Sequence, residues 1–199
     1  RWVAVNWFLT LRYVKNKYRQ SVLQQRQSLN DEDHSSLSEK IQEHFLCSFP
    51  LHNLGNIALY MPSNKEVGLE LILKETTRLK TLTLPVVRPN KQLQLIKPND
   101  GCEYFYNKYN ILEPAEGSEV NIYEHDLIIV PSIGVDKNGS RLGYGGGYYD
   151  RFFAHQKKNV KKPLIIGLLF HFQKIDNVFG EKHDIKFDRI FTELGEERF

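Results

Sequence analysis

Residues 126–151 read DLIIV followed by PSIGVDKNGSRLGYGGGYYDR, and they indicate the type of fold. The first five, Asp126–Val130, predict a buried strand that the following proline ends, because proline has no N–H to give to a sheet. Five of the chain's 13 glycines lie between positions 139 and 147. Residues 148–156 predict a helix. A strand, a glycine-rich turn and a helix in this order are typical of an open α/β sheet.

Apolar segments of strand length alternate with segments of helical spacing on both sides of this stretch. Leu69, Ile72, Leu73 and Leu79 predict one such helix, and residues 97–125 are expected to form loops with a short hairpin. This alternation predicts an α/β layered domain with a largely parallel sheet. The other expected strands are Ile57–Met61, Thr81–Pro85, Leu93–Ile96 at a sheet edge, Leu164–Leu169 and, as the last of the chain, Arg189–Thr192.

Two helices are expected before the first strand. The first covers residues 11–28, and Asn30 is the expected cap of the second. One face of the first helix is apolar and another is basic, because residues three or four apart lie on the same face. We expect residues 1–10 to form a disordered or loosely docked extension of a single domain at 11–199. The basic face carries Arg12, Lys15, Arg19 and Arg26.

The overall composition limits the class of protein. The chain has 199 residues, 41% of them hydrophobic, which is enough for one domain with a real core. Its net charge of +3 suits small polyanions such as nucleotide phosphates and argues against a nucleic-acid partner. The longest apolar run, Pro163–Phe170, is too short to span a membrane, and we expect a cytoplasmic protein. Cys47 and Cys102 are expected to be buried free thiols.

The glycine-rich segment has the chemistry of an anion site. Its glycines leave backbone N–H groups exposed, and the following helix adds unpaired N–H groups and the positive end of its dipole. Arg141 supplies a planar fork for phosphate, and Asp150 in the first helical turn could hold Mg²⁺. The chain has neither a Walker A loop nor the G-x-G-x-x-G pattern. The alternative is a plain glycine turn packed by tyrosines.

The run Arg141–Arg151 (RLGYGGGYYDR), preceded by Asp136–Gly139, resembles the signature of the 5-formyltetrahydrofolate cyclo-ligase family, also called methenyltetrahydrofolate synthetases. The resemblance extends over roughly residues 15–193. Its other parts are Lys15-x-x-x-Arg19, Ile57–Glu66 (IALYMPSNKE), Asn110–Pro114 (NILEP), Gly167–Gln173, His183-Asp184 and Asp188.

The resemblance implies a three-layer α/β/α single domain with a largely parallel or mixed central sheet. It also implies an enzyme that uses ATP and Mg²⁺ to cyclise 5-formyltetrahydrofolate to 5,10-methenyltetrahydrofolate, releasing ADP and phosphate. A monomer with small-molecule substrates is expected, without a nucleic-acid or membrane partner. The residues implied to hold ATP are Lys15, Asn16, Lys17, Tyr18, Arg19, Arg141, Leu142, Gly143, Tyr144, Gly145, Gly146, Gly147, Tyr148 and Tyr149.

Substrate, metal and catalytic roles are implied in the same way. Phosphoryl transfer to the formyl oxygen needs positioning and charge neutralisation more than a nucleophilic residue, so Arg141 and Tyr148 would be the catalytic residues. Asp150 and Asp184 would bind Mg²⁺. The residues implied to contact the folate are Met61, Glu66, Gly145, Gly147 and Tyr148.

Some residues depart from the family pattern. Gly146 stands where many members have lysine, which removes one possible phosphate contact, while Val135 and Phe179 look like packing changes. Two alternative functions stay open at this point. One is a related ATP-dependent enzyme acting on another pterin or amide, and the other is a non-catalytic nucleotide-binding module.

Overall fold

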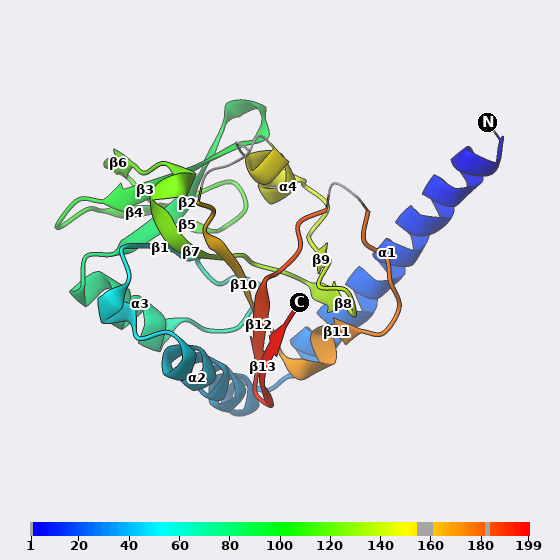
Figure 1. The fold of residues 1–199 in the computed structure, drawn as a ribbon, viewed down its shortest axis with the longest axis horizontal. Coiled ribbons are helices and arrows are strands. Elements are labelled where there is room, and N and C mark those ends of the chain that lie inside the picture. Colours follow the sequence, from blue (N-terminus) through cyan, green and yellow to red (C-terminus); the bar gives the residue numbers. More distant parts are fainter. Residues whose placement is uncertain (1, 155–160, 182–183) are drawn as a thin grey trace.

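The computed structural model describes the backbone of residues 2–154, 161–181 and 184–199, and the side chains from Leu11 onward within those ranges. An eight-stranded mixed sheet forms its centre (Figure 1). In spatial order the strands are β13 (Gly195–Arg198), β12 (Arg189–Thr192), β10 (Leu164–Leu168), β7 (His125–Ile129), β1 (Asn56–Ala58), β2 (Leu82–Arg88), β3 (Gln92–Pro98) and β6 (Gly117–Glu119).

The middle of the sheet is parallel and its two ends are antiparallel. Strands β12, β10, β7, β1 and β2 run in one direction, with Ile57 of β1 opposite both Leu82 and Leu127. The chain leaves β1 toward β2 on one side and returns to β7 on the other. The strand order therefore reverses between β1 and β7, and open α/β sheets bind ligands beyond the carboxyl ends of strands at such a point.

Helices cover both faces of the sheet. Helix α2 (Asp31–Ser48) begins at its cap Asn30, whose side chain accepts a hydrogen bond from the Asp33 N–H. It packs with α3 (Glu70–Arg78) against one face, and α4 (Tyr148–Ala154) packs against the other (Figure 1). The α/β/α layering and the mixed sheet agree with the fold class expected from the sequence.

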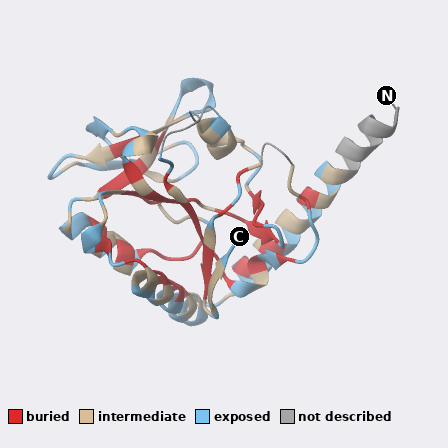
Figure 2. Ribbon diagram, in the orientation of Figure 1, coloured by how far each residue is buried: buried red, intermediate tan, exposed pale blue. Residues whose placement is uncertain are grey.

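Alternate residues of the central strands build two separate cores, because successive side chains of a strand point to opposite faces. Ile57, Leu127 and Ile166 lie in the core under α2 and α3, and their neighbours Ala58 and Ile128 lie in the core under α4. The buried residues form a continuous band through the sheet (Figure 2). Burying aliphatic side chains contributes roughly 1.5–3 kcal/mol each, so this two-sided core holds the sheet and its helices together.

The longest helix, α1 (Trp2–Ser28), lies beside the sheet rather than on it. It contacts a small three-stranded sheet made of β8 (Gly134–Asp136), β9 (Arg141–Leu142) and β11 (Lys174–Ile175). A third core, which includes Val22 of α1, joins the two. The remaining short elements are β4 (Tyr104–Tyr106) paired with β5 (Leu112–Pro114), and the 3-10 turns Leu51–Asn53, Pro89–Lys91, Ile122–Glu124 and His171–Gln173.

The structure corrects several sequence-based expectations. The first helix begins at Trp2 rather than at residue 11, so the backbone of residues 2–10 continues the helix. Strand β3 is not at the edge, since β6 pairs with it, and β12 is followed by a further strand, β13. The hairpin expected within 97–125 is β4 with β5. The boundary between an extension and a domain at residue 11 stays a prediction.

The two cysteines were expected to be buried, and this was wrong. Cys47 is exposed on α2, and Cys102 is partly exposed in the loop before β4. Val135 and Phe179, which depart from the family pattern, are both buried among apolar neighbours, as expected of packing changes. Within the part of the chain that the structure describes, no helix has the length and apolar character needed to cross a membrane.

Candidate active site

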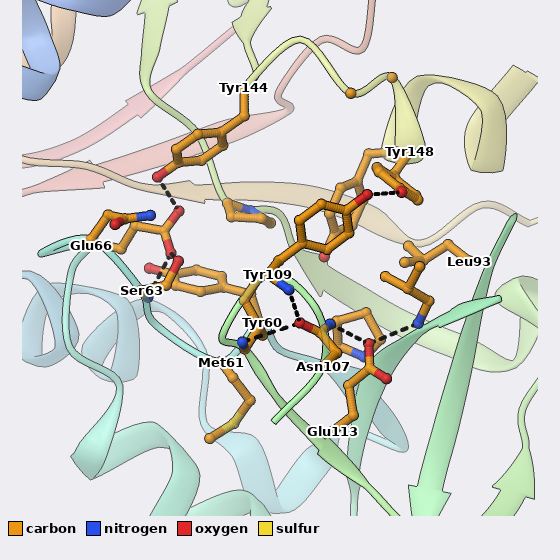
Figure 3. A pocket seen from close by; sticks show the side chains of 18 of the residues that line it. Tyr60, Met61, Ser63, Glu66, Leu93, Asn107, Tyr109, Glu113, Tyr144 and Tyr148 are labelled. Atoms are coloured by element: carbon orange, nitrogen blue, oxygen red, sulfur yellow. Dashed lines mark hydrogen bonds between the residues drawn. The ribbon is translucent and has the colours of Figure 1, made fainter. Parts of the chain in front are cut away.

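A cavity of about 440 Å³ lies beyond the carboxyl ends of β1 and β7, where the strand order reverses (Figure 3). Three segments form its walls. The loop after β1 brings Met61 and Glu66, the loop between β4 and β5 brings Tyr109, and the glycine segment brings Arg141 and Tyr148. Apolar side chains of β2 and β3 line the rest. This cavity has the size and mixed lining of a small-molecule site.

Glu66 is a buried carboxylate in the cavity wall, with 5% of its surface exposed. Its Oε1 accepts a hydrogen bond from the Tyr144 hydroxyl at 2.7 Å, and its Oε2 accepts from the Ser63 N–H at 2.9 Å. Burial raises the pKa of Glu66, while the donors of Ser63 and Tyr144 and the charge of Arg26 oppose the rise. Its position beside open space makes it an acceptor for a ligand's N–H groups.

Two tyrosines from distant segments meet across the cavity. The hydroxyls of Tyr109 and Tyr148 are 2.5 Å apart, and their rings lie edge to face with centroids separated by 5.9 Å (Figure 3). Below them the buried Glu113 accepts hydrogen bonds through Oε1 from the Val87 N–H at 2.9 Å and the Asn107 amide at 2.7 Å. These contacts hold the β4–β5 loop against the start of α4.

The glycine segment adopts a backbone that other residues rarely take. Gly145 and Gly147 have φ angles of 90° and 67°, in the left-handed region. At Gly143 φ is ordinary, but an added Cβ would lie 2.5 Å from Nη1 of Arg141. Glycine at these positions therefore lets the segment turn sharply and pack directly on the Arg141 guanidinium.

Arg141 is buried, with 7% of its surface exposed, and faces both the cavity and α4. Its Nη1 donates to the Pro131 carbonyl at 3.1 Å, and its Nη2 lies 3.8 Å from Asp150 Oδ2. Its buried Nε has no hydrogen-bond partner within the described residues. Burial lowers the pKa of Arg141, and the charge of Asp150 opposes that change. A buried guanidinium with a spare donor is suited to bind an anion.

Helix α1 brings two further cations to the same place. The Arg19 Nε donates to the Gly143 carbonyl at 2.8 Å, so the helix is tied to the glycine segment. The Lys15 ammonium lies 2.6 Å from Asp184 Oδ2 and 2.8 Å from Glu181 Oε2. Burial disfavours the charged lysine, but these two carboxylates outweigh it, so the pKa of Lys15 is raised.

A model of the 5-formyltetrahydrofolate cyclo-ligase family matches residues 12–193, nearly the whole chain. The chain belongs to that family. A 5-formyltetrahydrofolate cyclo-ligase of Mus musculus is 26% identical over 196 residues, which cover 93% of this chain and 96% of the mouse protein. Relatives from Haemophilus influenzae and Mycoplasma pneumoniae carry the same name, which is that of a ligase.

Solved structures of cyclo-ligase family proteins share the fold. A 5,10-methenyltetrahydrofolate synthetase of Aquifex aeolicus superposes with a TM-score of 0.80 at 32% identity, covering 93% of this chain and 92% of that one. The corresponding synthetase of Mycoplasma pneumoniae gives a TM-score of 0.72 at 25% identity, covering 90% and 98%. The similarity therefore covers at least nine tenths of this chain.

Several residues that the family resemblance assigns to ATP do not face the cavity. Lys17 is exposed on α1, and Leu142 is buried in the core beside α1. Asn16 accepts a hydrogen bond from Arg19 at 2.6 Å. Tyr18 packs on Phe179 with ring centroids 6.1 Å apart and accepts a hydrogen bond from Asn177. Asn16, Tyr18 and Leu142 therefore make their contacts with α1 or its neighbouring loops and core rather than with the cavity.

The folate residues implied by the family are grouped more closely. Met61, Glu66, Gly147 and Tyr148 line the cavity, whereas Gly145 lies outside its lining and faces the Arg19 guanidinium. Tyr149 turns inward: burial raises its pKa, and its ring lies 5.6 Å from the Arg141 guanidinium carbon.

The family implies Mg²⁺, and the donor chemistry of Asp150 and Asp184 fits it in part. Carboxylate oxygens are ligands that Mg²⁺ prefers, and both aspartates lie close enough to influence the charge of Arg19 and Arg141. Within the described residues, no group of three or more His, Cys, Asp or Glu side chains is arranged to hold a metal ion. A magnesium ion here would therefore complete its shell with water and with oxygens of the nucleotide. His183, next to Asp184, lies outside the described residues.

Sequence reasoning missed three residues of the site. Arg26 was assigned only to the basic face of α1, although its spacing of seven from Arg19 places both on one side of the helix. Glu113 lay inside the quoted segment NILEP but received no role. Tyr109 had no signal in the sequence, because its contact with Tyr148 depends on how the β4–β5 loop folds back.

Proposed function

We propose that this chain catalyses the ATP-dependent cyclisation of 5-formyltetrahydrofolate to 5,10-methenyltetrahydrofolate, with release of ADP and phosphate. The observation that carries the proposal is the position of Arg141. One guanidinium lines the cavity that holds Glu66 and also faces Asp150 and the glycine segment. A folate in the cavity and a triphosphate on the glycine segment would meet at this cation, and membership of the cyclo-ligase family supports the same reaction.

The reaction requires activation of a poor electrophile. Amide resonance makes the formyl carbon a poor electrophile. The formyl oxygen therefore first attacks the terminal phosphorus of ATP, and ADP leaves. The N10 amine of the folate then attacks the activated carbon and gives up its proton to solvent or to the departing phosphate, the bond to the phosphorylated oxygen breaks, and phosphate departs. Arg141 would stabilise negative charge on the transferred phosphoryl group, and Tyr148 in the cavity wall would orient the formyl group.

The triphosphate would lie between α1 and the glycine segment. Arg19 already contacts the backbone of this segment, and Lys15 lies on the same face of α1 one turn earlier. Backbone N–H groups near Gly145 and Gly147 could approach phosphate oxygens closely, because neither residue has a side chain. Asp150 and Asp184 would hold Mg²⁺, which neutralises charge on the phosphates when it is bound.

The folate would lie in the cavity with its ring system between apolar walls. Glu66 would accept hydrogen bonds from N–H groups of the pterin, and Met61 would pack against the ring. We further propose that the enzyme works as a monomer in the cytoplasm.

An absorbance assay for methenyl-folate with the purified chain, 5-formyltetrahydrofolate and Mg-ATP tests the proposal. We expect turnover that Asp150→Ala abolishes while 5-formyltetrahydrofolate still binds. The exposed Asp176→Ala is the matched control and should keep full activity. A folded protein that binds Mg-ATP without turnover would instead be a nucleotide-binding module. Turnover only of another formylated pterin or amide would assign a different substrate.

A further inference from the structure

Arg26 is a fully buried cation in the last turn of α1, with 0% of its surface exposed. Burying a guanidinium is costly unless its donors are used, and here they are. Its Nε donates to the Asn64 carbonyl at 3.1 Å, and its Nη2 donates to the same carbonyl at 2.5 Å. Its Nη1 reaches the Ser132 carbonyl at 3.5 Å. The helix is thereby fastened to the loops that follow β1 and β7.

A further contact of Arg26 leads into the cavity. Its Nη2 donates to the Tyr144 hydroxyl at 2.8 Å, and this hydroxyl donates to Glu66 Oε1 at 2.7 Å. Tyr144 keeps 43% of its surface exposed but turns its hydroxyl inward toward Glu66 (Figure 3). A guanidinium can only donate, so the single proton of the tyrosine hydroxyl is directed to the carboxylate.

The hydrogen bonds around Glu66 fit its ionised form. Its two oxygens accept from the Tyr144 hydroxyl, the Ser63 N–H and, at 3.3 Å, the Ser63 hydroxyl. A protonated carboxyl would set its own O–H against one of these donors. Burial favours the protonated form, so the ionised form needs a positive charge nearby, and Arg26 supplies one through a single intervening hydroxyl.

We propose that Arg26 is a positioning residue for the folate, which acts through Tyr144 to keep the Glu66 carboxylate ionised and fixed in the cavity wall. The inference rests on the proposed function, since it concerns how the same cavity holds its substrate. Because Arg26 also binds the carbonyl of Asn64, it holds the loop that carries Glu66 in register with α1.

Arg26 lies on the same face of α1 as Lys15 and Arg19, since eleven residues make almost a whole number of helical turns. One rigid helix therefore supports the glycine segment at one point and the Glu66 loop at another. Other groups also influence the charge of the Glu66 carboxyl. They are Arg141, Tyr60, Tyr144 and Tyr149, together with His34, whose ring contacts the Glu66 carbonyl at 2.8 Å.

A first experiment measures the charge of Glu66 directly in the free protein. The full chain is labelled with ¹³C at glutamate carboxyl groups, the Glu66 signal is identified by its loss in Glu66→Gln, and pH is varied. We expect Arg26→Met to raise the pKa of Glu66 by about one unit, as loss of a nearby opposite charge does. Arg26→Lys should raise the pKa of Glu66 by less, because lysine keeps a positive charge at this position. The control Arg12→Met removes an exposed charge of the same helix and should leave it unchanged.

A second experiment measures binding of 5-formyltetrahydrofolate without ATP between pH 5.5 and 8.5. We expect Arg26→Met to weaken binding increasingly as pH falls, up to about tenfold, which is the limit set by a rise of one pKa unit. The difference should vanish in the Glu66→Gln background. Circular dichroism and melting establish that each variant is folded, and Tyr144→Phe, which keeps the buried cation, provides an independent test of the link with a smaller expected shift.

The outcomes separate this inference from the proposed function. An unchanged pKa of Glu66, or a loss of binding that is equal at every pH, overturns the role of Arg26 while the cyclo-ligase activity can still stand. If the wild-type chain binds no 5-formyltetrahydrofolate although the pKa shift occurs, the proposed function fails, and with it the role of Arg26 in positioning substrate.

Discussion

The Lys15 ammonium lies 2.6 Å from the Asp184 carboxylate, although 169 positions separate the two residues in the sequence. The family resemblance assigns the lysine to ATP and the aspartate to Mg²⁺. Each residue thus has the other as a partner in the structure. Binding of Mg-ATP would exchange this ion pair for two new ones, with phosphate on the lysine and the metal on the aspartate. Such an exchange leaves few charges unpaired at any stage, which limits its cost in a partly buried site.

Lys15 should matter to nucleotide binding far more than Lys17. Lys15→Met removes the cation that pairs with Asp184, and we expect affinity for a non-hydrolysable Mg-ATP analogue to fall by about tenfold or more, the effect of one charged hydrogen bond. Lys17→Met changes an exposed charge two positions away and should alter affinity by less than about twofold. Calorimetry on both variants decides; equal losses would mean that the exposed face of α1 binds the nucleotide.

Arg141→Lys should reduce turnover more than substrate binding. Lysine keeps the charge but loses the planar fork that reaches both the cavity and the Asp150 side, so we expect kcat to fall by about 100-fold. The KM for 5-formyltetrahydrofolate should change by only a few-fold, because Glu66 and the apolar walls are untouched. Steady-state kinetics provide the measurement. A variant with normal kcat and a much higher KM would show that Arg141 binds the folate and takes no part in phosphoryl transfer.

His125 should make the protein less stable in mild acid. Its buried ring contacts the Thr83 hydroxyl at 2.8 Å and the Asn121 carbonyl at 3.0 Å, and burial lowers its pKa below the ordinary 6.5. The unfolded chain therefore takes up a proton first as pH falls. The contribution of the neutral ring is complete above pH 6.5 and is lost as pH falls from there toward the folded-state pKa.

Urea unfolding at a series of pH values measures this effect. The free energy of unfolding should decrease by up to about 1.4 kcal/mol per pH unit in that range because of this one group. His125→Gln should remove that part of the pH dependence, whereas the exposed His171→Gln should keep it. If both variants retain the wild-type slope, another group is responsible for the acid sensitivity.

Asp136 should be essential for the loop that carries Asp184. The buried carboxylate accepts four backbone hydrogen bonds, from the N–H groups of Asn138 and Ser140 through Oδ1 and of Phe179 and Gly180 through Oδ2. In Asp136→Asn an amide group would face two of these donors.

We expect this change to cost about 2–3 kcal/mol, the penalty for buried donors left unpaired. Chemical denaturation of the variant measures the loss, with the exposed Asp176→Asn as control. A stability within 0.5 kcal/mol of wild type, the range of a typical surface change, would contradict a supporting role for Asp136.

Much of the fold could be predicted because its elements are encoded locally. The run DLIIV became β7, and Ile57, Leu82 and Leu164 fall in strands where apolar segments predicted them. The start of α2 followed from the cap residue Asn30. Errors arose where packing decides. Strand β3 has the alternating pattern of an edge strand, yet β6, whose sequence has no apolar signal, pairs with it.

The candidate site also has features that the local sequence predicts and others that depend on packing. Residue types and spacing in the glycine segment indicated an anion site and, through the family resemblance, the reaction that we propose. The local sequence also specified the left-handed turns at Gly145 and Gly147, since a missing Cβ is what permits them.

Only the tertiary structure brought Lys15 to Asp184 and linked Arg26, through Tyr144, to Glu66. These contacts join segments far apart in the chain, and side-chain spacing along one helix carries no information about which loop it will meet. Burial also affects the charge state of Glu66, because that charge depends on the atoms that exclude water around the carboxyl group. The sequence alone therefore determined the local elements and the chemical type of the site, and three-dimensional packing determined which charges meet there.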